Sequence, residues 1–211
     1  MLTDQPVWLS SVCERVKTQC DQAWDSFVVG EQAWDTPMGE LVASFLKHGG
    51  PKAELQLIWL MMFATRRVLP CWQIYCDTSE PIETVNVIRN WLIAPQPQDW
   101  SKFITPAEPA YQGVQIVDCR QCDTSAVASA AAKAAEFIKH RNPLAVIESL
   151  GDADAAIDQS PLQAGNHYRK WFINVAIPTA YLLRDLTTDE QSAFLDYNID
   201  EVLKNSSKGE T

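Results

Sequence analysis

Apolar residues recur at intervals of three and four along most of this chain, which is the periodicity of helices with one buried face. Between Pro6 and Val29 these positions are Leu9, Val12, Val16, Cys20, Ala23, Trp24 and Phe27. A second stripe comprises Leu41, Val42, Phe45 and Leu46. The pair Thr36-Pro37 before it predicts an N-cap and a first turn, and Gly49-Gly50 after it predicts a left-handed stop. Two helices are therefore expected before residue 51.

Two further helices are expected between residues 51 and 94. Pro51 can open the first of them, which carries so few polar residues between Leu55 and Phe63 that it should be enclosed by other helices. Pro70 should kink or end it. Glu80-Pro81 with Glu83 predicts the next helix, because acidic side chains favour the positive end of the helix dipole. Its buried stripe runs up to Ala94 and consists of Val85, Ile88 and Leu92.

Residues 95–112 interrupt the helical pattern with four prolines and predict a loop with one short helical turn, the best linker candidate in the chain. Residues 113–118 (GVQIVD) alternate weakly, but a lone strand would have no partner, so a helix is preferred there.

The remaining sequence predicts several more helices. Residues 125–139 are rich in alanine, the best helix former. Pro143 and Gly151 bracket a two-turn helix, and Ser160-Pro161 opens a longer one that is bent at Pro178. Capping boxes are predicted at Thr187 with Glu190 and at Asn198 with Glu201. The expected fold is all-α, an antiparallel stack or bundle of about eight helices, in a single domain over residues 1–205 with a disordered tail at 206–211.

The net charge of the chain limits the kinds of molecule that it is expected to bind. The 211 residues include 27 acidic and 17 basic side chains, for a net charge of -10, which disfavours nucleic acid. Residues 1–30 lack a signal-peptide pattern, and the longest apolar run, Leu57 to Ala64, is too short to span a bilayer. A soluble cytoplasmic protein is expected, with neither nucleic acid nor a membrane as a partner. Residues 151–211 carry half of the net charge, so the C-terminal helices should present an acidic surface, and neutralising Asp152, Asp154 and Asp158 should weaken binding to a basic partner.

The six cysteines form three local pairs: Cys13 with Cys20, Cys71 with Cys76, and Cys119 with Cys122. Reduced thiols are expected in the cytoplasm, with Cys13 and Cys20 buried on one helix face. Cys119 and Cys122 have the spacing of a redox motif or half a zinc site, but neither the strand-helix context nor two further ligands are apparent. Ordinary thiols are therefore preferred and no cofactor is assigned; a metal-dependent enzyme using this pair is an alternative.

Other candidate chemistry is sparse. His48, His140 and His167 lie near predicted helix ends, where a structural or solvated role is expected. Asp152, Asp154 and Asp158 are spaced like the start of a calcium loop that lacks its central glycine and closing glutamate, so an acidic first helical turn is preferred. The sequence contains no Gly-x-Ser-x-Gly elbow, phosphate-binding loop or His-Glu-x-x-His motif, so an enzyme of a familiar class is disfavoured.

Three clusters have two readings each. Arg66 and Arg67 should pair with a carboxylate on a neighbouring helix, or they serve in binding. The run His167-Tyr168-Arg169-Lys170-Trp171 is either a helix face with snorkelling side chains or a recognition patch. Aromatic and methionine side chains of the middle helices are either core or the lining of a small-molecule pocket: Trp59, Met61, Met62, Trp72 and Trp91.

Short motifs between Leu57 and Ile138 resemble a known family. They are Arg67-Val68-Leu69-Pro70, Trp72, Glu80-Pro81, Val85 to Arg89 with Trp91-Leu92, and the alanine-rich run Ala126 to Ala135. Together they resemble the mostly helical immunity proteins of bacterial polymorphic-toxin systems. The resemblance implies a non-catalytic protein that binds and blocks a cognate toxin in its own cell. Negative charge suits a basic toxin, which it would attract electrostatically, although excess acid also serves solubility.

Overall fold

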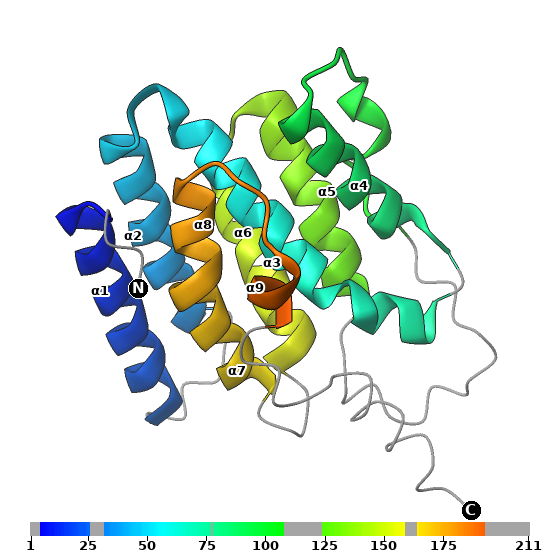
Figure 1. Cartoon of the computed structure of the whole chain (residues 1–211). Coiled ribbons are helices and arrows are strands. Elements are labelled where there is room, and N and C mark those ends of the chain that lie inside the picture. Colours follow the sequence, from blue (N-terminus) through cyan, green and yellow to red (C-terminus); the bar gives the residue numbers. More distant parts are fainter. Residues whose placement is uncertain (1–4, 26–31, 77, 108–123, 159–163, 193–211) are drawn as a thin grey trace, which may run out of the picture.

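A computed structural model describes residues 5–25, 32–76, 78–107, 124–158 and 164–192, and these residues form helices and connecting loops (Figure 1). The first half contains α1 (Val7–Asp25), α2 (Gln32–His48), the 3-10 turn η1 (Gly50–Lys52), α3 (Ala53–Tyr75), α4 (Glu80–Ile93) and the 3-10 turn η2 (Trp100–Lys102). The second half contains α5 (Thr124–His140), α6 (Pro143–Asp158), α7 (Ala164–Trp171), the π-helical turn η3 (Phe172–Ala176), α8 (Ile177–Tyr181) and α9 (Thr188–Ser192). Since α7, η3 and α8 are continuous, the described residues form eight helices, and the predicted all-α bundle is confirmed.

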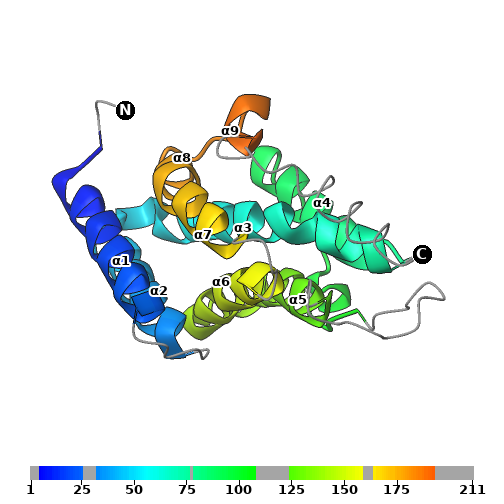
Figure 2. The same cartoon turned by 90° about the horizontal axis from the view of Figure 1, so that it is seen from below.

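Helix α3 occupies the centre of the bundle. Its residues 57–65 are all buried, which matches the prediction of an enclosed helix. Figure 2 shows α7 and α8 on one side of α3 and α5 and α6 on the other. Because every face of α3 meets another helix, its sequence needs no polar stripe along this stretch.

Helices α5 and α6 pack against each other more extensively than any other pair of described helices. Alanine side chains of α5, including Ala130, Ala131, Ala134 and Ala135, are buried, and small residues let helix axes approach closely. The Ser149 hydroxyl of α6 donates a hydrogen bond to the backbone oxygen of Ala130 at 2.9 Å. Burial therefore explains why the alanine-rich run is one long helix with little polar surface.

Three predicted helix boundaries need correction. Helix α2 begins at Gln32 rather than at Thr36-Pro37, so Pro37 lies inside the helix as a buried residue; packing of this part of the helix outweighs the hydrogen bond that the proline removes. Of the two outcomes predicted at Pro70, a kink or an end, the end is excluded, because α3 continues to Tyr75; the buried Cys71 and Trp72 anchor its last turns in the core.

The third correction concerns α6. Gly151 does not end this helix, which continues to Asp158. Its buried residues Ala153, Ala156 and Ile157 extend the apolar face beyond the glycine, and packing of that face outweighs the low helix propensity of one glycine. The left-handed stop after α2, in contrast, is confirmed at Gly50, where φ is +59°.

The irregularity expected at Pro178 takes the form of the π-helical turn η3. The backbone N–H of Ile177 donates to the oxygen of Phe172, five residues earlier. Pro178 has no N–H and its ring would clash with a carbonyl four residues before it, so a wider turn accommodates it. Ser160 and Pro161, the predicted start of this helix, lie outside the described residues.

The capping box at α9 is confirmed. The backbone N–H of Glu190 donates to Thr187 Oγ1 at 3.2 Å, and the N–H of Thr187 donates to Glu190 Oε2 at 3.0 Å. The loop predicted from residue 95 is confirmed as far as residue 107, with η2 as its short turn. Residues 113–118, Asn198, Glu201 and the tail lie outside the described residues.

Within the described part of the chain, no helix has the length and apolar character needed to cross a membrane.

Candidate functional site

An open cavity of about 350 Å³ lies beside the start of α4. Residues from three segments surround it: the first turn of α4, the stretch from η2 to residue 107, and the middle of α5. The lining residues are Glu80, Pro81, Glu83, Thr84, Lys102, Phe103, Thr105, Ala107, Ala128, Ala131 and Ala132.

The floor of this cavity is apolar because α5 contributes only methyl groups to it. Ala128, Ala131 and Ala132 are buried, and their small side chains leave the space that larger residues would fill. Phe103 adds an aromatic surface, while the Thr84 hydroxyl is engaged by the backbone oxygen of Glu80 at 2.9 Å. A ligand in the cavity would therefore meet hydrocarbon at its base.

The rim of the cavity is acidic on one side. Glu80 and Glu83 are exposed in the first turn of α4, where a carboxylate complements the helix dipole, and the Ser79 hydroxyl donates a hydrogen bond to Glu83. Lys102 also lines the cavity and is exposed, so the rim carries one cation beside the two carboxylates. An acidic rim above a hydrocarbon floor suits a long cation, such as a lysine or arginine side chain or an organic amine.

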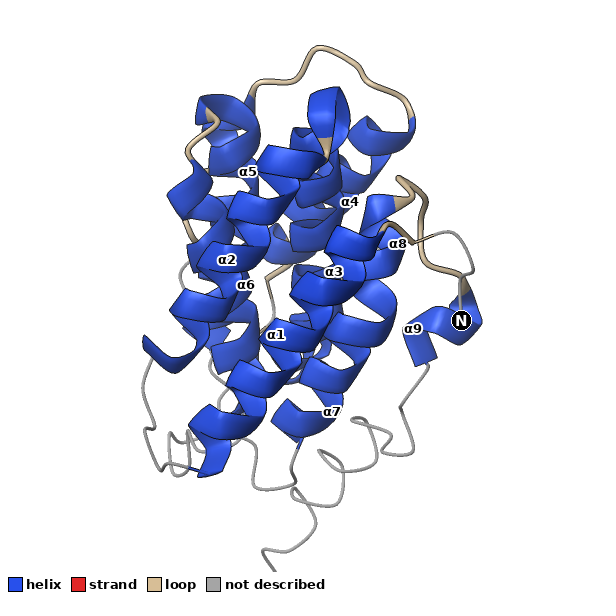
Figure 3. Ribbon diagram, turned by 90° about the vertical axis from the view of Figure 1, so that its left-hand side faces the viewer, coloured by secondary structure: helices blue, strands red, loops and turns tan. Residues whose placement is uncertain are grey.

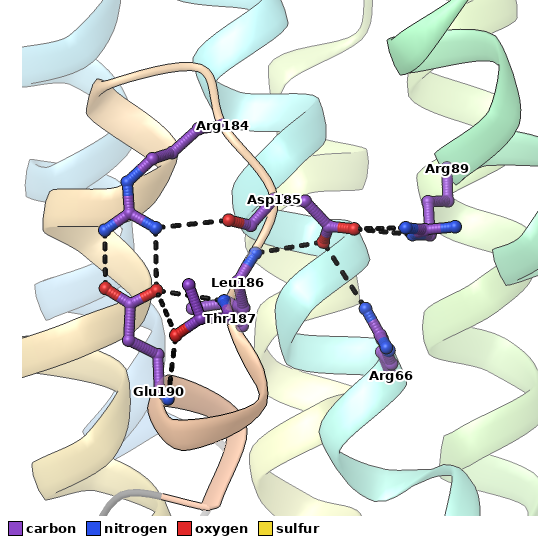
Figure 4. A network of polar contacts seen from close by, with 7 residues as sticks. All are labelled: Arg66, Arg89, Arg184, Asp185, Leu186, Thr187 and Glu190. Carbon is purple, nitrogen blue, oxygen red and sulfur yellow. Dashed lines mark hydrogen bonds and ion pairs between the residues drawn. The ribbon is translucent and has the colours of Figure 1, made fainter.

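The prediction of an ion pair for Arg66 is confirmed, with a partner in a loop rather than on a helix. Arg66 Nη1 lies 3.3 Å from Asp185 Oδ1, and Arg89 Nε donates to Asp185 Oδ2 at 2.6 Å (Figure 4). Asp185 thus joins α3 and α4 to the segment that follows α8. Arg67 instead packs over the Trp171 ring, 4.8 Å from its centroid, and burial lowers the pKa of its guanidinium to about 10.

We define residues 182–192, the loop after α8 together with α9, as the strap. Arg184 forms an ion pair with Glu190 within the strap, and this contact lowers the pKa of the Glu190 carboxyl to about 2 (Figure 4). The Trp171 indole N–H donates to the backbone oxygen of Glu190 at 2.9 Å, and Leu186 is buried. The strap is therefore attached to the bundle by ion pairs, by hydrogen bonds that include the one from Trp171, and by the apolar side chains of Leu183 and Leu186.

The run from His167 to Trp171 does not form a single surface. Tyr168 and Trp171 are buried in the core, His167 is half-buried and Lys170 is exposed. Arg169 pairs with the buried Asp154, with Nη2 to Oδ2 at 2.6 Å and Nε to Oδ1 at 2.9 Å. The recognition patch proposed for these residues is thus not assembled in this structure, because helix periodicity directs the two aromatic rings inward.

The three aspartates predicted to begin a helix instead lie in the second half of α6, so the expected acidic first turn is wrong. Asp154 is only 4% exposed and faces Arg169, which contradicts its assignment to an acidic surface. Asp152 is half-buried, and the side chain of Asp158 lies outside the described part. Neutralising Asp154 would therefore disturb the core as well as the net charge.

One buried hydroxyl near this ion pair is unsatisfied. The Tyr168 hydroxyl has no hydrogen-bond partner among the described residues. Burial raises the pKa of this phenol well above its usual value, and the neighbouring Asp154 carboxylate raises it further.

The tryptophan and methionine residues considered for a small-molecule pocket pack in or against the core. Trp59, Met61, Met62 and Trp72 are buried, and Trp59 packs against Phe63 with ring centroids 5.4 Å apart. Trp91 is half-buried and meets Trp100 edge-on at 5.7 Å. None of the five lines the cavity beside α4. The sequence predicts the acidic first turn of α4 and the alanine-rich helix α5 as separate features. It does not predict that Lys102 and Phe103 contribute to a site, or that these three segments meet around one cavity.

No group of three or more metal-binding side chains is found within the described residues. Cys119 and Cys122 lie outside them, so the structure does not bear on the predicted thiol pair. Cys71 and Cys76 are buried. Burial raises the pKa of the half-buried Cys13 to about 11, and the side chain of Cys20 lies outside the described part.

The histidines are found near helix ends, as predicted. His48 ends α2 and stacks on Trp8 with ring centroids 5.3 Å apart, His140 ends α5, and His167 is in the first turn of α7.

No family model matches this sequence, and comparison with curated proteins and with solved structures likewise gives no match.

Proposed function

We propose that this chain is a non-catalytic binding protein for a basic partner, and specifically an immunity protein that neutralises a cognate toxin. The observation that carries the proposal is the cavity beside α4, with carboxylates on its rim and alanines on its floor. Two of the segments that resemble immunity proteins, Glu80-Pro81 and the alanine-rich run, contribute to its lining. The net charge of -10 supports the same class of partner, because it accelerates encounter with a basic surface.

In the proposed complex a lysine or arginine side chain of the toxin enters the cavity. Its methylene groups lie on Ala128, Ala131 and Ala132, and its charged end reaches Glu80 and Glu83. Hydrogen bonds to charged groups contribute about 1.5–3 kcal/mol each, so the loss of one contact weakens binding about 10- to 150-fold.

The test is co-expression of this chain with the toxin encoded beside its gene, followed by calorimetric titration of the purified proteins. We expect protection from the toxin, and a weaker affinity for the double variant Glu80→Gln, Glu83→Gln. The matched control is Glu14→Gln, Glu40→Gln, which removes the same charge from α1 and α2. Absence of a neighbouring toxin gene together with absence of protection would refute the immunity role. Equal affinity of the two double variants would refute the cavity as the binding site.

A second candidate function is the binding of a small organic cation in the same cavity. Its volume of about 350 Å³ lies within the range of small-molecule sites. A thermal-shift screen of organic amines would test this. A ligand that raises the Tm of the native protein but not of the Glu80→Gln, Glu83→Gln variant would favour it.

A further inference from the structure

Exposed aliphatic side chains are gathered at one end of the bundle. Each of the six comes from a helix end: the starts of α1, α3 and α6, or the ends of α2, α4 and α8. In the antiparallel bundle the ends of α2, α4 and α8 and the starts of α3 and α6 lie toward the upper end in Figures 1 and 3, and the start of α1 lies lower, beside the last turns of α2. We define this surface as the apolar end, and in the described part of the chain it contains all the large hydrophobic side chains that are largely exposed: Val7, Leu46, Leu55, Ile93, Leu144 and Leu182.

Contacts between neighbouring residues show that the starts of α1 and α3 and the ends of α2, α5 and α8 adjoin. Trp8, next to Val7, meets Phe45 near the end of α2 and Tyr181 at the end of α8, with ring centroids 5.5 and 5.8 Å apart. The Gln56 amide in α3 donates to the backbone oxygen of Tyr181 at 2.9 Å. Arg141, just after α5, pairs with Glu54 in α3 at 3.4 Å.

Basic side chains surround the exposed aliphatic residues, although the chain as a whole is strongly acidic. Lys47, Lys52, Lys139 and Arg141 are exposed here, together with His48 and His140. The carboxylates at this end include Glu54, which pairs with Arg141, and Asp99, whose side chain accepts from the backbone N–H of Ser101. The helix dipole accounts for the pattern, since cations are favoured in the last turns of α2 and α5.

From this arrangement we infer that the apolar end docks on an anionic lipid bilayer. A specific protein partner would require a contiguous, shape-matched patch, whereas these aliphatic side chains are separate and come from different helices. A fluid interface accepts separate apolar side chains, and its lipid headgroups attract the cations around them. This peripheral contact requires no membrane-spanning helix.

The net charge of -10 does not prevent such docking. The 23 residues of α3 span about 35 Å from this end to the opposite one. Screening at physiological ionic strength acts over about 8 Å, so carboxylates at the far end are not felt at the lipid surface. The protein would therefore bind with its long axis upright and with the cavity beside α4 accessible from the side.

Co-sedimentation of the full chain with vesicles tests the inference. We expect binding to phosphatidylcholine vesicles that contain phosphatidylserine, weaker binding as salt is raised, and little binding to phosphatidylcholine alone. Lys47→Gln with Lys52→Gln should lower the partition coefficient about 25-fold, at about fivefold per lysine. Val7→Ser with Leu144→Ser should lower it about tenfold or more.

The matched control is Lys17→Gln with Lys170→Gln, which removes two exposed lysines away from the apolar end and should leave binding within about twofold of native at 0.15 M ionic strength. Circular dichroism of every variant verifies folding. Lack of binding to anionic vesicles, or equal loss in the control, overturns the inference. The inference is also overturned if Val7→Ser with Leu144→Ser changes the oligomeric state but not the binding to vesicles. That result would assign the apolar end to contacts between two copies of this chain. The Glu80→Gln, Glu83→Gln variant should bind vesicles like the native chain, so this test is independent of the proposed toxin site.

Discussion

Removal of the Asp154 carboxylate should destabilise the protein more than loss of any exposed ion pair. The side chains of Asp154 and Arg169 are 5% and 15% exposed. Three contacts of 2.6–3.2 Å join them. Asp154→Ala would leave a buried guanidinium without this counter-ion, and such changes cost about 3–5 kcal/mol. In a chain of this length 3 kcal/mol corresponds to a decrease in Tm of about 6–12 °C.

The comparison is with Arg15 and Glu40, whose side chains are 51% and 42% exposed. Breaking that pair by Glu40→Ala should cost no more than about 1 kcal/mol. Urea unfolding followed by circular dichroism gives the free energies of unfolding. The double variant Asp154→Ala, Arg169→Ala should cost less than the sum of the two single variants, because neither charge is then left alone. If Asp154→Ala lies within about 1 kcal/mol of the native protein, the reasoning about this buried pair is wrong.

Four further predictions follow from individual side chains. The Glu190 pKa of about 2 lies below its ordinary value of 4.5. Its pairing with Arg184 therefore stabilises the fold above about pH 4.5, and this contribution is lost as the pH falls toward 2. Glu190→Gln should flatten the dependence of Tm on pH between these two values. Tyr168→Phe should raise stability by about 1 kcal/mol in urea unfolding, because it removes a buried hydroxyl that lacks a partner among the described residues, and a loss of stability would contradict this reasoning. Gly50→Ala should cost about 1 kcal/mol despite open space around it, since φ is +59°; an unchanged Tm would refute the strain. Because its pKa is about 11, Cys13 should react slowly with iodoacetamide at pH 8. The rate, measured by peptide mass spectrometry, should rise about tenfold for each pH unit up to pH 11. Fast labelling at pH 8 would exclude a buried thiol.

The helices that could be predicted correctly carry strong local signals. Helix α4 begins at Glu80, where an acidic residue precedes a proline, and the Thr187–Glu190 capping box forms as its residue spacing requires. Gly50 stops α2 because only glycine readily adopts its backbone conformation. In each case the interaction that decides the structure lies within four residues.

Predictions failed where packing between distant segments overrides local preference. Gly151 is a weak helix residue, but α6 continues through it because the residues beyond are buried. Helix α3 likewise continues through Pro70, so of the kink and the end predicted there the end does not occur. The pairing of Asp154 with Arg169 spans 15 residues and converts an expected surface carboxylate into a core residue. The cavity beside α4 likewise depends on α4, η2 and α5 coming together, which no local pattern encodes.

The strap also constrains the order in which the protein can fold. Asp185 bonds Arg66 and Arg89, which precede it by 119 and 96 residues. Contacts at such separations form late because a long loop must first be closed, and during synthesis α3 and α4 leave the ribosome well before residue 185. We therefore expect strap docking to be the last event in maturation of the newly made chain. Until then Leu186 stays in water, and the Trp171 indole lacks the hydrogen-bond acceptor that Glu190 supplies.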